Sequence, residues 1–474
     1  MPILSNKGSA LFRALKRLIY PRRGGRAITL IAMSCLLLLT VAAVAFLMGF
    51  SQSPALNSAE SRIASAARAI AADVRFKRLS DGGLLLNGTL EGRQFALAVP
   101  RNWNRQAMLF ARGYSTPGSS TDVAKNPLKD DKFGILTAPY AQDFAVGLSA
   151  FDKAGMSVES GVANTLRLKH FVDNLGATRV YVSGGSMGGN IVVALIEKYP
   201  RDFAGGLAAC VVVDWPSEIG RLVDLRAAYN YFTRDTQYEL PGNQDLNQSA
   251  LSTFSSGLPK PIAKITRFLQ IKRAADPLLD LFAAAEANPG GPEERIIDNI
   301  AAVTGAERDR ASFGIPLVTA ALGMDDLNAT FGGTVYDNTD KQYVSPHLTP
   351  QENAALNIGI QRTHAADSAA AAKAAEWYKT TGRFEVPLLS LFNEIDPLVP
   401  SSVQEPKLRF AVEQAGNVER LLERRVPAMR AKVPGADAMG YVHCGFTKEQ
   451  VAKAWNELRG WVETGIRADQ VERL

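Results

Sequence analysis

A serine flanked by glycines carries the clearest chemical signal in the sequence. Gly184-Gly185-Ser186-Met187-Gly188 fits the pattern G-x-S-x-G, with a β-branched apolar run before it and a helical pattern after it. A serine on such a sharp strand–turn–helix connection needs small residues two positions to either side, here Gly184 and Gly188, because larger ones would clash. The pattern predicts a nucleophilic serine held in strained backbone geometry. A phosphate-binding loop is the alternative, but these glycines do not fit G-x-G-x-x-G.

A nucleophilic serine needs a general base, and the sequence contains four histidines. His443 lies in a loop-like segment just before a closing amphipathic helical pattern at 448–462, where the chain order Ser, Asp, His places the base. His170 lies on a helical stretch before the serine, His347 in a Pro-flanked loop, and His364 at the start of an Ala-rich helix. We expect those three to be solvated or packed, and predict His443 as the base.

The base in turn needs a carboxylate that fixes its tautomer and stabilises its protonated form. Asp396 follows an apolar strand pattern and lies 47 residues before His443, and Pro397 fixes the turn after it. Glu394 and Asp214 are the alternatives, the first as a neighbour in the same turn and the second as the residue that follows the next strand after the serine. We predict Asp396 as the third member of a Ser-His-Asp triad.

The negative charge that develops on an attacked carbonyl must meet backbone donors already in place. The N–H of Met187, directly after the serine, is one predicted donor. The second is expected from the loop Arg112-Gly113-Tyr114, which follows an earlier buried strand. Gly113 and Tyr114 are both candidates, and the sequence does not choose between them.

The elements that must position these residues follow an alternating pattern. Short apolar runs alternate with longer helical stretches beyond residue 70, which predicts an α/β fold with a mostly parallel sheet. We expect residues 71–214 and 381–474 to form one catalytic domain. Between them, residues 215–380 consist of Ala-rich helical stretches without a fixed repeat, and predict a helical insertion.

In this order, the segments resemble the α/β-hydrolase superfamily, specifically its membrane-anchored or secreted esterase-like serine hydrolases. The resemblance covers roughly residues 80–474 and is carried by Arg112-Gly113-Tyr114, by the turn at Ser186, by Asp396-Pro397-Leu398-Val399-Pro400 and by His443-Cys444-Gly445-Phe446. It implies an eight-stranded sheet, a helical cap over the site at 215–380, and catalysis without a metal or an organic cofactor. Two positions depart from the patterns of relatives: Arg112 stands where many have histidine, and Gly185 where tannases and feruloyl esterases have cysteine.

The cysteines suggest a covalent link within the site. Cys210 ends the strand after the serine, and Cys444 adjoins the predicted base. Outside the cytoplasm such a pair can oxidise, and a Cys210–Cys444 bridge would tether the histidine loop to the sheet; two buried reduced thiols are the alternative. Because three cysteines and scattered histidines show no zinc-ligand spacing, we expect no metal site.

The N-terminus has the composition of a membrane anchor. Residues 1–26 contain seven Lys and Arg and no acid, and residues 27–50 are uncharged and apolar. As a helix the second segment is about 36 Å long, enough to cross a hydrocarbon core of about 30 Å. The positive-inside rule then places 1–26 in the cytoplasm and everything after the anchor in the periplasm or outside the cell, with 51–70 as a tether. A cleaved signal peptide, giving a secreted protein, is the alternative.

The basic tail also accounts for the net charge. Subtracting its seven positive residues from the total of +6 leaves −1 for residues 51–474, so the electrostatic signature of a nucleic-acid-binding protein is missing. With 46% hydrophobic residues, the 474-residue chain has ample material for a large core. We therefore predict a serine hydrolase that cleaves small or oligomeric carboxylic esters. A peptidase or amidase with the same triad and a non-catalytic, membrane-tethered binding protein are the alternatives, and the oligomeric state stays undetermined.

Overall fold

The structure, a computed structural model, describes residues 58–129, 131, 133–252, 258–365 and 368–468. The predicted basic tail and anchor, and the first part of the predicted tether, lie outside these ranges. Within them, no helix combines the length and the apolar character needed to cross a membrane.

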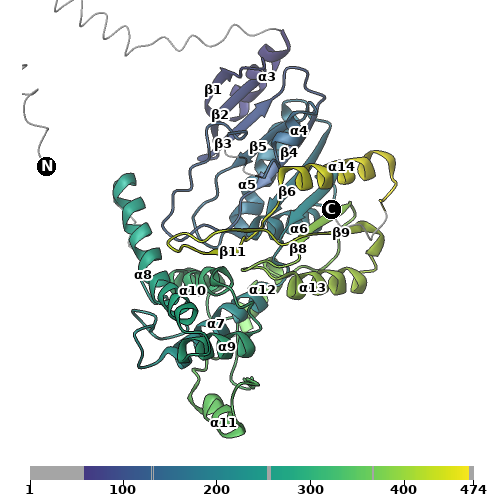
Figure 1. The fold of residues 1–474 in the computed structure, drawn as a ribbon. Helices are drawn as coiled ribbons and strands as arrows, with labels where there is room; N and C mark the ends of the chain where they lie inside the picture. Colours follow the sequence, from purple (N-terminus) through teal and green to yellow (C-terminus); the bar gives the residue numbers. More distant parts are fainter. Residues whose placement is uncertain (1–57, 130, 132, 253–257, 366–367, 469–474) are drawn as a thin grey trace, which may run out of the picture. The chain divides into compact units, whose positions relative to one another are not determined.

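A nine-stranded mixed sheet is the centre of the fold, in the order β1-β2-β3-β5-β4-β6-β7-β8-β9 (Figure 1). Its strands are β1 (Ala72–Arg78), β2 (Leu84–Leu90), β3 (Arg93–Val99), β4 (Gln106–Ala111), β5 (Ala145–Ser149), β6 (Arg179–Gly185), β7 (Gly205–Ala209), β8 (Leu388–Asn393) and β9 (Leu421–Val426). From β1 to β5 the pairs are antiparallel, and from β5 across to β9 they are parallel. The predicted α/β fold with a mostly parallel sheet is confirmed.

The sheet has one strand more than the eight that the resemblance implied. Strand β1 runs antiparallel to β2 at the edge of the sheet, and most of its residues are exposed. Its sequence, ADVRFKR, contains only two large apolar residues, Val74 and Phe76, which pack partly buried against the core. An edge strand with so few apolar residues gives no buried-strand signal in the sequence.

Helices cover both faces of the sheet. They are α3 (Ser58–Ile70), α4 (Thr137–Tyr140), α5 (Val158–Asn174), α6 (Met187–Lys198), α13 (Ser401–Gln414) and α14 (Lys448–Thr464), with a 3-10 turn, η1 (Val418–Arg420), before β9. On one face α14 begins with a capping box between Thr447 and Gln450. Its Trp455 meets Phe144 and Tyr181 edge to face, with ring centroids 5.1 and 5.0 Å apart. Helices α5 and α6 pack into the core on the opposite face.

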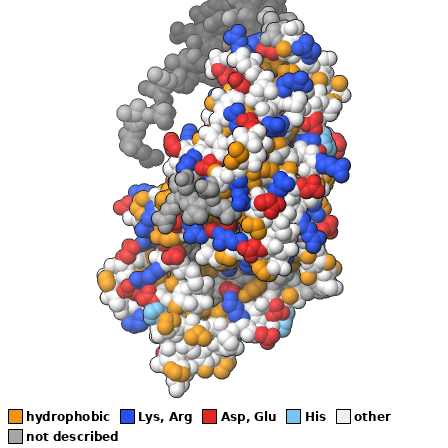
Figure 2. Space-filling view, turned by 90° about the vertical axis from the view of Figure 1, so that its right-hand side faces the viewer, with side chains coloured by type: hydrophobic (Ala, Val, Ile, Leu, Met, Phe, Trp, Pro, Cys, Tyr) orange, Lys and Arg blue, Asp and Glu red, His pale blue; other side chains and the backbone are white. Residues whose placement is uncertain are grey.

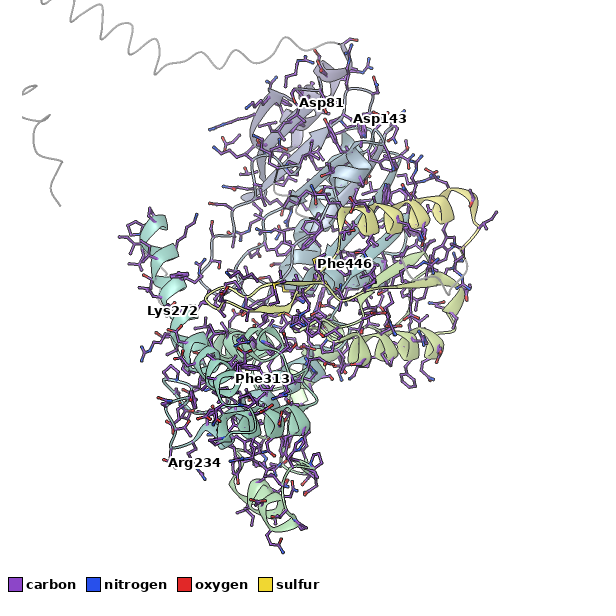
Figure 3. The ribbon with its side chains drawn as sticks, viewed as in Figure 1. Asp81, Asp143, Arg234, Lys272, Phe313 and Phe446 are labelled. Atoms are coloured by element: carbon purple, nitrogen blue, oxygen red, sulfur yellow. A yellow bond between two sulfur atoms is a disulfide. The ribbon has the colours of Figure 1, made fainter. Side chains whose placement is uncertain are left out.

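Within the described residues, six helices separate β7 from β8. They are α7 (Trp215–Thr233), α8 (Lys260–Ala287), α9 (Pro292–Thr304), α10 (Arg310–Phe331), α11 (Pro350–Gly359) and α12 (Ser368–Trp377), and Figure 1 shows them gathered below the sheet. We call this group the cap. Its interior is apolar: Phe313, labelled in Figure 3, meets Phe282 edge to face at 5.5 Å.

A short hairpin leads from the sheet across to the cap and back. Strands β10 (Arg430–Lys432) and β11 (Met439–Tyr441) pair antiparallel. Asp309, the N-cap of α10, accepts hydrogen bonds from the first turn of its helix and also from the Tyr441 N–H at 3.2 Å. Arg430 lies 3.4 Å from the same carboxylate. The chain that follows β11 is therefore braced by the cap.

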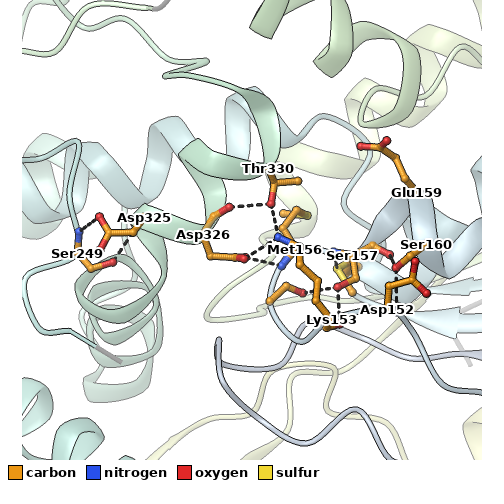
Figure 4. A network of polar contacts seen from close by, with 12 residues as sticks. Asp152, Lys153, Met156, Ser157, Glu159, Ser160, Ser249, Asp325, Asp326 and Thr330 are labelled. Carbon is orange, nitrogen blue, oxygen red and sulfur yellow. Dashed lines mark hydrogen bonds and ion pairs between the residues drawn. The ribbon is translucent and has the colours of Figure 1, made fainter. Parts of the chain in front are cut away.

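Cap helix α10 also contacts the loop after β5, through the carboxylate of Asp326 and the hydroxyl of Thr330, which accepts from Lys153 Nζ at 2.6 Å (Figure 4). Asp326 Oδ1 accepts from Lys153 Nζ at 2.7 Å, and Oδ2 accepts from the Met156 N–H at 2.7 Å. Gly155 has a φ of +84°, and a Cβ there would lie only 2.2 Å from Asp326 Oδ2. The approach of the helix to this loop thus requires glycine, and the carboxylate joins cap to sheet.

Substitution of Asp326 tests this junction. We expect Asp326→Ala to speed amide hydrogen exchange in residues 152–157, with local opening easier by about 1–2 kcal/mol, because the loop loses two hydrogen bonds. Asp325→Ala is the matched control, since Asp325 accepts from the Ser249 N–H within the cap. Equal exchange at 152–157 in the two variants, measured by mass spectrometry, would contradict this role.

Candidate active site

Ser186 occupies the turn between β6 and α6 in left-handed backbone, with φ 57° and ψ −125°. Its N–H donates to the Ala209 carbonyl at the end of β7, at 3.0 Å, which holds the turn against the neighbouring strand. A Cβ at Gly184 would lie 2.4 Å from the Gly188 carbonyl oxygen, and one at Gly188 would lie 2.2 Å from the Ala111 oxygen. Backbone crowds both sides of the serine, and only glycine fits at these two positions.

The structure brings Asp396 and His443 together at the same edge of the sheet. Nδ1 of His443 lies 2.8 Å from Asp396 Oδ1. That oxygen also accepts from the N–H groups of Leu398 and Val399, at 2.9 and 2.8 Å, and Oδ2 accepts from the Cys444 N–H at 2.7 Å. Because Nδ1 faces a carboxylate, it carries the proton in the neutral ring and leaves Nε2 as the acceptor, which is the tautomer of a general base.

Burial and charge act in opposite directions on this pair. Burial raises the pKa of Asp396, but the imidazole of His443 and the backbone N–H groups outweigh burial and hold that pKa below its usual range. Burial lowers the pKa of His443, but the carboxylate of Asp396, with a smaller contribution from Glu218, raises it above its ordinary value. Asp396 therefore stays ionised, and His443 takes up a proton more readily than a free imidazole does.

Glu218, which was not predicted from the sequence, is a second buried carboxylate close to the pair. On the first turn of α7, its Oε1 accepts from Arg221 Nη1 at 2.8 Å and its Oε2 from Gln404 Nε2 at 2.9 Å. Arg221 also donates to the Leu398 carbonyl at 3.1 Å, in the turn that holds Asp396. Burial raises the pKa of Glu218. In the sequence it is an ordinary acidic residue near a helix N-terminus, and only the packing reveals its position.

The alternative acids and bases lie outside this cluster. Asp214 caps α7 by accepting from the Ser217 N–H at 3.3 Å and pairs with Lys407 at 2.7 Å. The side chain of Glu394 is exposed. The other three histidines are also exposed: His170, His347 and His364.

A disulfide joins the His443 loop to the sheet. Cys210, directly after β7, is bonded to Cys444, with Cα atoms 5.5 Å apart. The Cys210 N–H donates to the Leu391 carbonyl of β8 at 2.7 Å. A Cβ at Gly185 would lie 3.5 Å from Cys210 Sγ, and Cys444 Sγ lies 3.4 Å from His443 Nε2. The disulfide thus packs between the serine turn and the histidine. The two sulfurs and the imidazole are close enough to share a metal ion, but sulfurs bonded to each other offer no thiolate ligand.

Two segments with the predicted backbone donors lie next to the serine. Met187 is the first residue of α6, so its N–H has no acceptor within the helix. Gly113 follows β4, and a Cβ there would lie 3.7 Å from the Ser186 Cβ. The hydroxyl of Tyr114 is buried against α10, where a Cβ at Gly323 would lie 2.6 Å from it, and burial raises the pKa of this hydroxyl. The loop that flanks the serine is therefore in direct contact with the cap.

Arg112, the departure from the histidine of many relatives, holds this same loop. Its guanidinium donates to the carbonyls of Thr121 and Asp122, at 3.0 and 3.3 Å, and lies 5.1 Å from the centre of the Phe151 ring. Burial lowers its pKa. The two hydrogen bonds from Arg112 therefore hold residues 121 and 122, later in the same loop, close to the end of β4.

The chain has only distant similarity to known proteins. No family model and no curated protein sequence matches the chain. It is similar to feruloyl esterase B from Aspergillus oryzae (12% identity, 88% of this chain and 93% of that one, TM-score 0.41) and to a membrane phospholipase A described as a bacterial virulence factor (12%, 92% and 99%, TM-score 0.36). It is also similar to a thermophilic esterase from Thermogutta terrifontis (14%, 83% and 100%, TM-score 0.34). At such low similarity, the assignment of a reaction rests on the geometry of this chain.

An NMR titration tests whether Glu218 raises the pKa of His443. We expect the His443 ring to titrate above the pKa of free imidazole, and Glu218→Gln to lower that pKa, because the variant removes a negative charge that favours the protonated ring. Glu405→Gln is the control: Glu405 is a buried carboxylate that pairs with Arg425 at 2.7 Å, outside the site. The ring Cε1–H signal would be assigned with His443→Gln; an unchanged pKa in Glu218→Gln would argue against the coupling.

The disulfide is expected to stabilise the folded state strongly, because it closes a loop of 234 residues. Replacing both Cys210 and Cys444 by alanine should lower the free energy of unfolding by about 2–5 kcal/mol. Urea unfolding followed by circular dichroism measures this change. Cys35→Ala, at the third cysteine of the chain, should leave the unfolding midpoint where it is, and an unshifted midpoint in the double variant would contradict the prediction.

Proposed function

We propose that this protein is a serine hydrolase that cleaves carboxylic esters, with Ser186 as the nucleophile, His443 as the general base and Asp396 as the carboxylate that orients it. The observation that carries the proposal is the hydrogen bond between the buried Asp396 and His443, whose loop is joined by the Cys210–Cys444 disulfide to the strand end beside the Ser186 turn. Ser186 follows β6 and Asp396 follows β8, two parallel strands that flank β7, and His443 follows the β10–β11 hairpin. This is the arrangement expected for acyl transfer by a hydroxyl nucleophile.

The reaction proceeds in two balanced halves. His443 Nε2 takes the proton of the Ser186 hydroxyl while Ser186 Oγ forms a bond to the ester carbonyl carbon. The carbonyl oxygen becomes an oxyanion. When this intermediate collapses, the C–O bond to the alcohol breaks and His443 returns the proton to the leaving oxygen. Water then repeats the sequence on the acyl-enzyme and releases the acid. This scheme uses neither a metal ion nor an organic cofactor.

Backbone donors stabilise the oxyanion in both halves. The N–H of Met187 and an N–H from Gly113 or Tyr114 would bind the oxygen, since both segments flank Ser186. The cap contributes indirectly: Gly323 of α10 packs against Tyr114, and Asp309 of the same helix braces the strand before His443. We infer that the cap shapes the substrate pocket and determines which small or oligomeric esters enter it.

We further propose that residues 27–50 anchor the protein in a membrane, with the catalytic domain in the periplasm or outside the cell. The Cys210–Cys444 disulfide supports this location, because structural disulfides persist in oxidising compartments. Positive and negative side chains alternate over the face seen in Figure 2, which agrees with a body that does not bind nucleic acid.

Labelling of the full chain with a fluorophosphonate tests the nucleophile. We expect modification at Ser186, mapped by mass spectrometry, and a drop in p-nitrophenyl ester turnover of roughly 10⁴- to 10⁶-fold in Ser186→Ala. Ser183→Ala is the matched control, because Ser183 lies buried on the same strand and should not be needed for the reaction. A folded but unlabelled protein would exclude the catalytic proposal. Faster cleavage of peptide anilides than of esters would instead identify a peptidase or amidase.

A further inference from the structure

The first half of α8 exposes a row of large apolar side chains. Four of these side chains have at least half of their surface exposed: Ile262 (50%), Ile265 (61%), Phe268 (65%) and Leu269 (56%). In the second half of the same helix, Leu278 is fully buried in the cap. Figure 1 shows the first half projecting away from the other cap helices. Exposed apolar residues this closely spaced usually mark a contact surface.

The apolar residues share one side of the helix. Ile262, Ile265 and Leu269 are spaced three and four residues apart, so they line one face, and Phe268 lies beside it. The other side is bound to the protein: Arg267 donates to the Gly118 carbonyl at 2.9 Å. A polar contact therefore holds the helix in place while its apolar face points outward.

The same stretch is basic and contains no acid. Five Lys and Arg occur between Asp245 and Asp276, and no Asp or Glu occurs between those two residues. Lys264, Lys272 and Arg273 are exposed within the apolar row. Lys272, labelled in Figure 3, pairs with Asp276 at 2.5 Å, and this is the first acid that the helix reaches.

We propose that this face of α8, defined by Ile262, Ile265, Phe268 and Leu269, docks on the surface of an anionic lipid bilayer. An interfacial helix buries an apolar face at the level of the headgroups while Lys and Arg extend toward lipid phosphates. Both features occur here on one side of one helix. A second copy of the same face would bring positive charges together, which disfavours a symmetric dimer at this surface.

The docking face adds a second membrane contact to the expected anchor at 27–50. Once the anchor holds the chain at a bilayer, the effective concentration of lipid near α8 is high, so a modest apolar and electrostatic attraction suffices. Arg267 binds the loop that also carries Gly113 and Tyr114. Docking would thus fix the surroundings of the candidate active site relative to the membrane. The proposal does not depend on the reaction that the site performs.

An environment-sensitive fluorophore on the full chain tests the docking. The label NBD would be attached to Phe268→Cys in a Cys35→Ser background, with the protein reconstituted in nanodiscs of phosphatidylcholine with or without phosphatidylglycerol. We expect a blue-shifted, brighter emission in the discs with phosphatidylglycerol, and quenching by brominated acyl chains. The matched control is Ile358→Cys on α11, which is 88% exposed and carries no basic apolar row around it, and should not respond.

Charge reversal tests the electrostatic part of the proposed lipid contact. A triple variant should abolish the fluorescence response at position 268 without changing the circular dichroism of the protein; its substitutions are Lys264→Glu, Lys272→Glu and Arg273→Glu. The proposal is overturned if the label at 268 does not respond, if 268 and 358 respond alike, or if the response is the same with and without phosphatidylglycerol. A response that grows with protein concentration in the absence of lipid would identify a second copy as the partner instead.

Discussion

The buried carboxylate of Asp396 is the constraint around which the site is built. A charged group that is 3% exposed must find its hydrogen bonds within the protein, and Asp396 finds them in its own turn and in the His443–Cys444 loop. The carboxylate therefore fixes the histidine ring and the loop that carries it at once. Removal of either partner would leave a buried charge or an unsatisfied donor.

A disulfide and a set of hydrogen bonds from Arg221 further stabilise this arrangement. The disulfide attaches the histidine loop to the end of β7, beside the turn of Ser186, and Arg221 links the Asp396 turn to Glu218 on the first cap helix. Glu218 adds negative charge near an imidazole that must become positive during the proposed reaction. Both contacts act on the geometry and the charge of His443, the residue proposed to move the proton.

One helix of the cap contacts three segments around the candidate site. Helix α10 meets the strand before His443 through Asp309, the loop beside the serine through Gly323, and the loop after β5 through Asp326. These contacts are local, and the positive φ of Gly155 favours glycine at the last of them. They connect the cap to the segments that flank Ser186 by direct packing.

The α/β class, most of the strands and the order of the candidate residues could be predicted from the sequence, because apolar periodicity and the glycines around Ser186 are local signals. It also suggested the Cys210–Cys444 pair while leaving two reduced thiols open. It could not reveal β1, whose exposed edge position leaves few apolar residues. It favoured Asp396 over Asp214 and Glu394 from the turn after the strand, but the contact of Asp396 with His443 and the position of Glu218 near that pair became visible in the folded protein. Those contacts join residues far apart in the chain, and their strength depends on burial, which packing alone creates.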